Sequence, residues 1–288
     1  MTDLIVDGNS LYARAWYATA KDFIDANDVL RSALQTVFSL INPEVDRIGE
    51  QIDRTLFCWD GDHGRDKGER QEKPREYDEV REIFKDVLTA LIGAAHARPE
   101  HHEADDAVAT AIYNSKARLI YVVSGDKDLT QLMTDRVRYY DLNQQMVLSR
   151  NAVLQKFHVK HPNQVSIALA ILGDRTDNIK GIRGWGPAKV KKLFERIDED
   201  MTYEDVVIRI EEQIPPNLHE DFYASLDRTL LDHAIPGLPG AAPIKLASYD
   251  EMREIGIIGL GESYARLYKG YTGENVSAGV AVGMDESD

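Results

Sequence analysis

The chain has 288 residues, of which 43% are hydrophobic, so it can bury a sizeable core in one large domain or in a main domain with a smaller one. No apolar run is long enough to span a membrane and the first residues lack the pattern of a signal peptide, so we expect a cytoplasmic protein. A single cysteine excludes an intramolecular disulfide, and the net charge of −15, taken alone, argues against a nucleic-acid partner.

Over the first half of the chain, short segments rich in β-branched or aromatic residues alternate with segments of helical spacing. The predicted strands are residues 4–6, 55–59, 119–124 and 137–142. The predicted helices are residues 11–20, 29–41, 80–92 and 104–113. Strands that alternate with helices imply an α/β fold, in which a mostly parallel central sheet has helices on both faces.

From about residue 151 the pattern becomes helical. The predicted helices are residues 153–157, 165–172, 188–196, 203–213 and 218–233, with a last helical stretch after the Pro-Gly segment 236–240. The tail 272–288 is rich in small residues and ends in acids, so we expect it to be poorly ordered. These patterns predict an α/β domain at 1–150 and a helical region at 151–271.

Acidic residues follow three of the predicted strands. Asp7 follows the first, Asp60 follows the second, and Asp126 and Asp128 follow the third. Because the carboxyl ends of parallel strands meet at one edge of a sheet, where ligands bind, we expect these side chains to be neighbours. Two further groups stand at the starts of helical patterns or on one helical turn. They are Glu103, Asp105 and Asp106, and the pair Asp174 and Asp177.

Nine carboxylates at one edge would repel one another strongly without cations. Hard oxygen ligands select magnesium or manganese rather than zinc, and two such ions about 4 Å apart suit the hydrolysis of a phosphodiester. A single aspartate after a strand is more often a cap or a turn residue, but separate segments that deliver acids to one edge favour a metal site. Much of the negative charge then lies where cations are needed, so it no longer argues against nucleic acid.

The acidic motifs resemble, in their order, those of the flap endonuclease-type 5′ nucleases. This family includes the nuclease domain of bacterial DNA polymerase I and stand-alone bacteriophage 5′–3′ exonucleases, which share a PIN-like 5′ nuclease fold. The matching segments are VDGNSL at 6–11 with Arg14, FCWD at 57–60, EADD at 103–106, SGDKDL at 124–129 and GDRTDN at 173–178. The resemblance covers roughly residues 3–200.

The resemblance implies a role for each acid. The residues implied to hold ions directly or through water are Asp7, Asp60, Glu103, Asp105, Asp106, Asp126 and Asp128. Asp174 and Asp177 are implied to complete a second, more weakly held site. The implied cofactors are two Mg²⁺ or Mn²⁺ ions, and Lys127 is expected to be a local structural residue.

The stretch 179–196 resembles the helix-hairpin-helix of the same family. Its glycines permit a tight turn with exposed backbone N–H groups, and the helix that follows favours a phosphate at its N-terminus. The local net charge of +5 between Lys180 and Arg196 favours phosphate binding over an ordinary Gly-Pro turn. The resemblance adds a potassium ion bound by backbone carbonyls. The expected nucleic-acid contacts are Arg14, Gly184, Gly186, Lys189, Lys191 and Lys192.

The charged segment at about 61–95 occupies the position of the family's helical arch, beneath which a single-stranded 5′ end passes. The family pattern has an aromatic before a lysine and an arginine three residues later. Here Lys73 follows a glutamate, and Arg75 is only two residues on. We expect Lys73 to contact the scissile phosphate, with Arg75 and Arg81 as alternatives, although a solvated loop has the same composition.

Together these features predict a two-metal 5′–3′ exonuclease or structure-specific flap endonuclease of DNA replication or repair. Its expected partners are DNA with a 5′ flap, a nick or a 5′ end, an RNA–DNA hybrid, and replication proteins, and it is expected to be a monomer. The alternatives are a non-catalytic structure-specific DNA-binding protein, a PIN-type ribonuclease, which lacks the hairpin, and an aspartate-dependent phosphatase. The last is disfavoured because position 9 is asparagine.

Overall fold

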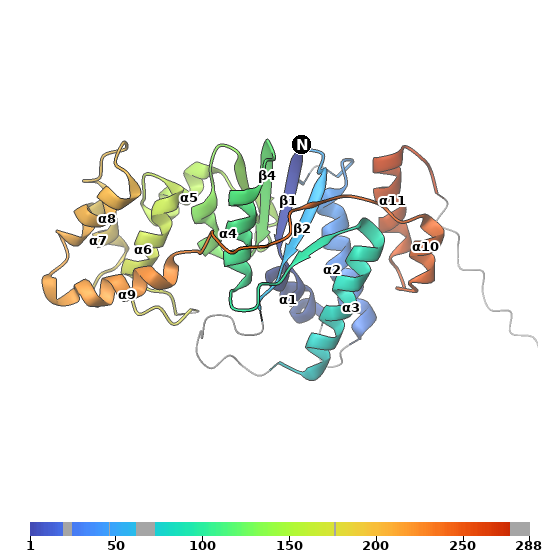
Figure 1. The fold of residues 1–288 in the computed structure, drawn as a ribbon, viewed down its shortest axis with the longest axis horizontal. Helices are drawn as coiled ribbons and strands as arrows, with labels where there is room; N and C mark the ends of the chain where they lie inside the picture. Colours follow the sequence, from blue (N-terminus) through green and yellow to red (C-terminus); the bar gives the residue numbers. More distant parts are fainter. Residues whose placement is uncertain (20–24, 46, 62–72, 176, 277–288) are drawn as a thin grey trace, which may run out of the picture.

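The computed structural model describes residues 1–19, 25–45, 47–61, 73–175 and 177–276. Residues 62–72 of the expected arch, residue 176 of the last acidic motif and most of the expected tail lie outside the described residues. The described residues form a central, mostly parallel sheet with helices on both faces, which confirms the predicted fold (Figure 1). None of their helices is both long and apolar enough to cross a bilayer.

The described part of the sheet has seven strands. They are β1 (Thr2–Asp7), β2 (Arg54–Cys58), β3 (Ala95–Ala97), β4 (Leu119–Ser124), β5 (Val137–Asp141), β6 (Met146–Val147) and β7 (Ala242–Pro243). Their order is β3-β2-β1-β4-β5-β6, and β7 pairs with β2. Strands β1 to β5 are parallel to their neighbours, whereas β6 and β7 are antiparallel. The four predicted strands are confirmed, and the three that were not predicted have only two or three residues.

The described helices follow the predicted spacing closely. They are α1 (Gly8–Thr19), α2 (Ala26–Ile41), α3 (Arg75–Ile92), α4 (Ala104–Asn114), α5 (Arg150–Phe157), α6 (Val165–Leu172), α7 (Pro187–Phe194), α8 (Tyr203–Glu211), α9 (His219–Thr229), α10 (Tyr249–Glu254) and α11 (Gly261–Thr272). Three 3₁₀ turns are η1 (Lys127–Leu132), η2 (Pro162–Gln164) and η3 (Pro216–Leu218). Helix α3 begins five residues before the predicted start, because the buried Tyr77 anchors its polar first turn.

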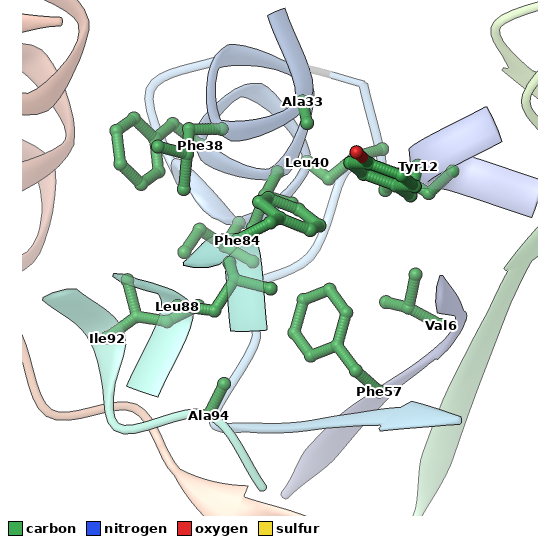
Figure 2. Packing of buried hydrophobic residues seen from close by; sticks show 14 of the residues in the cluster. Val6, Tyr12, Ala33, Phe38, Leu40, Phe57, Phe84, Leu88, Ile92 and Ala94 are labelled. Atoms are coloured by element: carbon green, nitrogen blue, oxygen red, sulfur yellow. The ribbon is translucent and has the colours of Figure 1, made fainter. Parts of the chain in front are cut away.

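Alternate residues of each strand enter two different cores. In β1, Leu4 and Val6 face one core, while Ile5 faces the other. The first core lies under α1, α2 and α3, where Figure 2 shows Phe84 of α3 between the other helices and Phe57 of β2. The second core lies under α4 to α9. This double burial explains why the strands read as continuous apolar runs rather than as alternating ones.

The expected helical region 151–271 divides in the structure. Helices α5 to α9 pack on one side of the sheet, but the chain after α9 runs across the molecule to the other side (Figure 1). There β7 pairs with β2, and α10 and α11 pack beside α2. The reason is apolar burial, because Leu260, Tyr264 and Leu267 are fully covered in the first core. The last helices therefore pack with the α/β part of the molecule.

Candidate active site

The carboxyl edge of the sheet gathers the first acidic side chains. Asp7 is the last residue of β1 and pairs in register with Cys58 of β2, two residues before Asp60. Asp126 follows β4, the neighbour of β1 on the other side. Asp60 Oδ1 accepts a hydrogen bond of 3.0 Å from the backbone N–H of Ala104, which fixes the start of α4 to this edge. The parallel topology therefore brings together residues more than 100 positions apart.

Asp7 is held rigidly in a buried position. Its carboxylate accepts hydrogen bonds from Ser124 Oγ at 2.6 Å and from the Ser10 backbone N–H at 3.0 Å. Burial, with smaller contributions from the charges of Asp126 and Asp60, raises the pKa of Asp7 to about 7 in spite of these hydrogen bonds. A buried carboxylate beside other carboxylates is an unfavourable arrangement that a bound cation would relieve.

Two serines also fix the segment that carries Asp126. The backbone N–H of Asp126 donates to Ser124 Oγ at 2.9 Å, and that of Gly125 donates to Ser10 Oγ at 2.8 Å. Asp126 Oδ1 in turn accepts from the Asp128 backbone N–H at 2.9 Å and caps η1. One oxygen of Asp126 is therefore used in the turn, which orients the whole carboxylate.

A second acidic group lies beside the first. Carboxylate oxygens of Asp128, Asp174 and Asp177 are all within 4.8 Å of one another. Asp128 Oδ1 is buried and has no hydrogen-bond partner among the described residues. Burial, together with the charge of Asp126, raises the pKa of Asp128 to about 7. An orphaned buried acceptor among hard oxygen donors fits a divalent cation such as magnesium.

Lys127 lies at this second group. Its Nζ forms an ion pair with Asp174 Oδ2. Together with Asp126, Asp174 and Asp177 it lines a polar cavity of about 400 Å³. In the metal-free protein the ammonium group therefore neutralises part of the acidic cluster.

The acids at the start of α4 are not equivalent. Asp106 is buried, and its oxygens accept from the backbone N–H of Asp232 at 2.8 Å and of Glu103 at 3.5 Å. These hydrogen bonds tie the segment after α9 to the start of α4.

The single cysteine of the chain lies close to the acids. Burial and the charges of Asp7 and Asp105 raise the pKa of Cys58 well above its usual value, so its thiol is an inert buried group.

The three expected phosphate contacts in the arch segment differ in their surroundings. Lys73 Nζ lies 4.1 Å from the centre of the Tyr77 ring. Arg81 pairs with Asp78 at 2.9 Å, and Arg75, which is almost fully exposed, pairs with Glu79 at 2.7 Å. The family's aromatic partner is absent before Lys73, but Tyr77 supplies a ring four residues later. Lys73 precedes α3, whose N-cap is Pro74, so no helical spacing in the sequence indicated this contact.

Two glycines that the sequence did not single out shape the loop between α6 and α7. Gly173 and Gly181 have φ angles of +76° and +64°, which side chains rarely adopt. A Cβ on Gly181 would lie 2.4 Å from the backbone nitrogen of Gly173. This close approach, with the mutual backbone hydrogen bonds of Asp174 and Ile179, holds the Asp174 carboxylate toward the second acidic group.

The expected nucleic-acid contacts of the loop lie on an open surface. Gly184 has a φ of +77° and Gly186 precedes the first turn of α7, and a Cβ added at either glycine would meet no described atom within 4 Å. Lys189, Lys191 and Lys192 are exposed on α7. The ammonium group of Lys189 lies 4.7 Å from the centre of the Trp185 ring.

A mostly parallel sheet with two adjoining acidic groups at its carboxyl edge defines an α/β protein suited to hold divalent cations. The family of the 5′–3′ exonuclease, N-terminal resolvase-like domain, matches residues 2–158, and the chain belongs to this family.

Relatives and solved structures match a larger part of the chain than the family model does. A 5′–3′ exonuclease of Mycoplasmopsis pulmonis is 32% identical over 66% of this chain and 65% of its own length. The flap endonuclease Xni of Shewanella denitrificans is 28% identical over 68% of this chain and 77% of its own length. A T5 5′-exonuclease with bound zinc ions has a TM-score of 0.55, with 18% identity over 94% of this chain and 93% of that one. The catalytic core of Rad2 with a DNA substrate has a TM-score of 0.58, with 13% identity over 92% and 91%. At these low identities, the two structures show a likeness to this chain in fold alone.

Proposed function

We propose that the chain is a divalent-metal-dependent 5′ nuclease that hydrolyses DNA phosphodiesters, as a 5′–3′ exonuclease or a structure-specific flap endonuclease. The observation that carries the proposal is the pair of adjoining acidic groups at the sheet edge, each with a buried aspartate whose pKa is raised to about 7. Such an edge is unfavourable without cations and favourable with them. The names of the relatives, 5′–3′ exonuclease and flap endonuclease, support this substrate class.

The proposed ion-holding residues form two subsites. The first comprises Asp7, Asp60, Glu103, Asp105, Asp106 and Asp126, and the second comprises Asp128, Asp174 and Asp177. Two bound Mg²⁺ or Mn²⁺ ions would supply a hydroxide nucleophile and stabilise the leaving oxygen. Ser10 and Ser124 keep Asp7 and Asp126 in fixed positions, so the protein pre-organises the edge before substrate arrives.

Basic side chains on both sides of the edge would bind the substrate. Lys73, whose ammonium group lies over the Tyr77 ring, is the proposed contact of the scissile phosphate, with Arg75 and Arg81 of α3 as alternatives. On the other side, the loop with Gly184 and Gly186, the lysines of α7, and Arg14 of α1 would hold the phosphate backbone without regard to sequence. We propose that this loop is a helix-hairpin-helix that also binds K⁺.

The proposed substrates are DNA with a 5′ flap, a nick or a 5′ end, and RNA primers annealed to DNA. Such an activity serves primer removal in replication and strand processing in repair. We propose further that the protein acts as a monomer in the cytoplasm.

A cleavage assay tests the proposal directly. Labelled flap, nicked and blunt substrates are incubated with Mg²⁺ and then with a chelator, and the product lengths are measured. Asp126→Ala and Asp174→Ala should slow cleavage by at least about a hundredfold while DNA binding persists, because each removes charge that holds an ion. The matched control is Asp135→Ala, which removes an exposed carboxylate before β5, at the opposite edge of the sheet. Full activity of both site variants in saturating Mg²⁺ would refute the metal assignment, and binding without cleavage by the wild type would leave a DNA-binding protein.

A further inference from the structure

A second cavity lies on the α1–α2 side of the sheet edge, and it contains no carboxylate among its described lining residues. It has a volume of about 220 Å³ and is lined by Arg14 of α1, by Arg47, by the polar side chains of α2, and by the turn after β5. We call it the arginine pocket. Its volume is below the range of about 300–1,000 Å³ that encloses drug-sized ligands, so it suits a small group and its waters.

Within the described part of the chain, the two arginines of the pocket face uncharged side chains. Arg47 donates to Tyr140 Oη at 3.3 Å and to Gln145 Oε1 at 3.5 Å, and both acceptors are uncharged. Within the described residues neither Arg47 nor Arg14 has a carboxylate at ion-pair distance. Other arginines of this acidic chain do face acids, as Arg54 and Arg31 do. Two guanidinium groups in one concave site, without an acid among the described residues that line it, favour the binding of an anion.

The remaining lining matches an anion with several oxygens. Ser32 and Gln35 add a hydroxyl and an amide from one side of α2. Thr36 and Ser39 donate their hydroxyl protons to carbonyls of their own helix, so the guanidinium groups, Ser32 and Gln35 are the available donors. Gln145 has a φ of +54°, a left-handed conformation that is uncommon for residues other than glycine. Such conformations cluster at ligand-binding sites.

The pocket shares a wall with the acidic edge. Leu142 and Gln145 of the turn after β5 line the pocket, whereas Asn143 and Gln144 line the cavity that contains Asp126. Asn143 also donates to the Gly125 carbonyl at 3.0 Å, which joins the turn to the acidic segment. Helix α1 begins beside Asp7, and Arg14 follows Gly8 by six residues, or about 9 Å along the axis. At about 3.4 Å of axis per nucleotide, this is roughly two or three nucleotides along one strand.

We infer that the arginine pocket binds a backbone phosphate of the nucleic-acid substrate, a few nucleotides from the phosphate that is cleaved. The inference rests on the proposed nuclease function. Arg47 is its central residue, because Arg47 reaches the pocket from the segment between α2 and β2 and is fastened there by Tyr140. The contact would position the substrate strand against the acidic edge without reading its bases.

Binding is measured in chelator, where no cleavage can occur, by fluorescence anisotropy with labelled flap DNA. A series of DNAs carries one uncharged methylphosphonate at each linkage within four nucleotides of the cleavage site. The proteins are the wild type, Arg47→Ala, Arg47→Lys and Arg118→Ala. Arg118 is exposed beside the amino end of β4, so its variant loses the same charge at the far edge of the sheet.

The wild type should bind one DNA of the series several-fold more weakly than unmodified DNA, because the methylphosphonate replaces the phosphate that the pocket binds. Arg47→Ala should bind unmodified DNA several-fold more weakly, and a methylphosphonate at that linkage should not weaken its binding further. The slope of its log affinity against log salt concentration should be smaller by about one. Arg47→Lys should recover part of the affinity, and Arg118→Ala should behave as the wild type. Melting temperatures check that each variant is folded, which is expected because Arg47 is exposed.

Three results would overturn the inference. The first is an Arg47→Ala protein whose affinity and linkage profile equal those of Arg118→Ala. The second is a thermal shift by inorganic phosphate that Arg47→Ala abolishes while its DNA profile stays unchanged, since the pocket is then a site for free anions. The third is a wild type that binds none of the DNAs, which would overturn the proposed function as well; the first two leave that function intact.

Discussion

Replacing Asp128 by asparagine is expected to stabilise the metal-free protein at neutral and alkaline pH, although it removes a proposed ion ligand. Asp128 Oδ1 is buried without a hydrogen-bond partner among the described residues, beside the carboxylates of Asp174 and Asp177. Burial and neighbouring negative charge raise its pKa from 3.8 to about 7. The asparagine amide can donate to the neighbouring carboxylates and carries no charge.

The size and pH range of the effect follow from the pKa shift. The folded state binds the Asp128 proton more tightly than the unfolded state does. The contribution of this proton to the stability of the fold is therefore complete below pH 4 and is lost as the pH rises through about 7. One pKa unit corresponds to about 1.36 kcal/mol, so the rise from 3.8 to about 7 sets a ceiling of about 4 kcal/mol. Because the asparagine amide must itself be buried, we expect Asp128→Asn to gain less than this ceiling, roughly 1–3 kcal/mol at pH 8.

The measurement is the free energy of unfolding in urea, in chelator, for both proteins between pH 4 and pH 8. The difference should grow from near zero at pH 4 to a plateau above pH 7. Saturating Mg²⁺ should stabilise the wild type more than Asp128→Asn. Asp135→Asn, at an exposed position, should match the wild type at every pH. A loss of stability in Asp128→Asn at pH 8 in chelator, or a difference that does not vary with pH, would refute the reasoning.

The ion pair of Lys127 with Asp174 leads to a prediction of opposite sign: Lys127→Met should lower metal-free stability by roughly 1–3 kcal/mol and should tighten Mg²⁺ binding, as measured by urea unfolding and by calorimetric titration. Unchanged values of both would show that the ammonium group does not neutralise the site. Gly181→Ala should cost roughly 2–4 kcal/mol, because its φ is +64° and its Cβ would collide with the Gly173 backbone, whereas Gly184→Ala, which meets no described atom, should cost less. Equal melting temperatures for the two alanine variants would contradict the close packing of the loop.

The sequence was sufficient for the parallel sheet and for the position of most acids. The central strands are buried on both faces, so their apolar runs are long and distinct, and an acid that follows such a run must lie at the carboxyl edge. It was not sufficient for features that depend on contacts between distant segments. The pairing of β7 with β2 joins residues nearly 190 positions apart through two residues of each strand, which leaves no periodic pattern.

Two features of the site depend on packing that the local sequence does not reveal. Gly184 and Gly186 stand out in a Gly-Pro motif, whereas the need for glycine at Gly173 and Gly181 is revealed only by the close approach of one backbone to the other. The ring that accompanies Lys73 comes from Tyr77, after the lysine rather than before it. In both cases three-dimensional packing, rather than sequence adjacency, selects the residue.

The crossing of the chain after α9 has a consequence for the order of events during synthesis. The α/β half is completed by β7, α10 and α11, and the bond from Asp232 to Asp106 is made on the way. Although domains usually fold from the N-terminus as they emerge, this half cannot finish folding until about residue 272 has left the ribosome. By then α5 to α9 have already been translated. The first core is thus fully covered only on a chain that already possesses the lysine-bearing helix α7, and a nascent chain that ends before α10 leaves part of that core exposed.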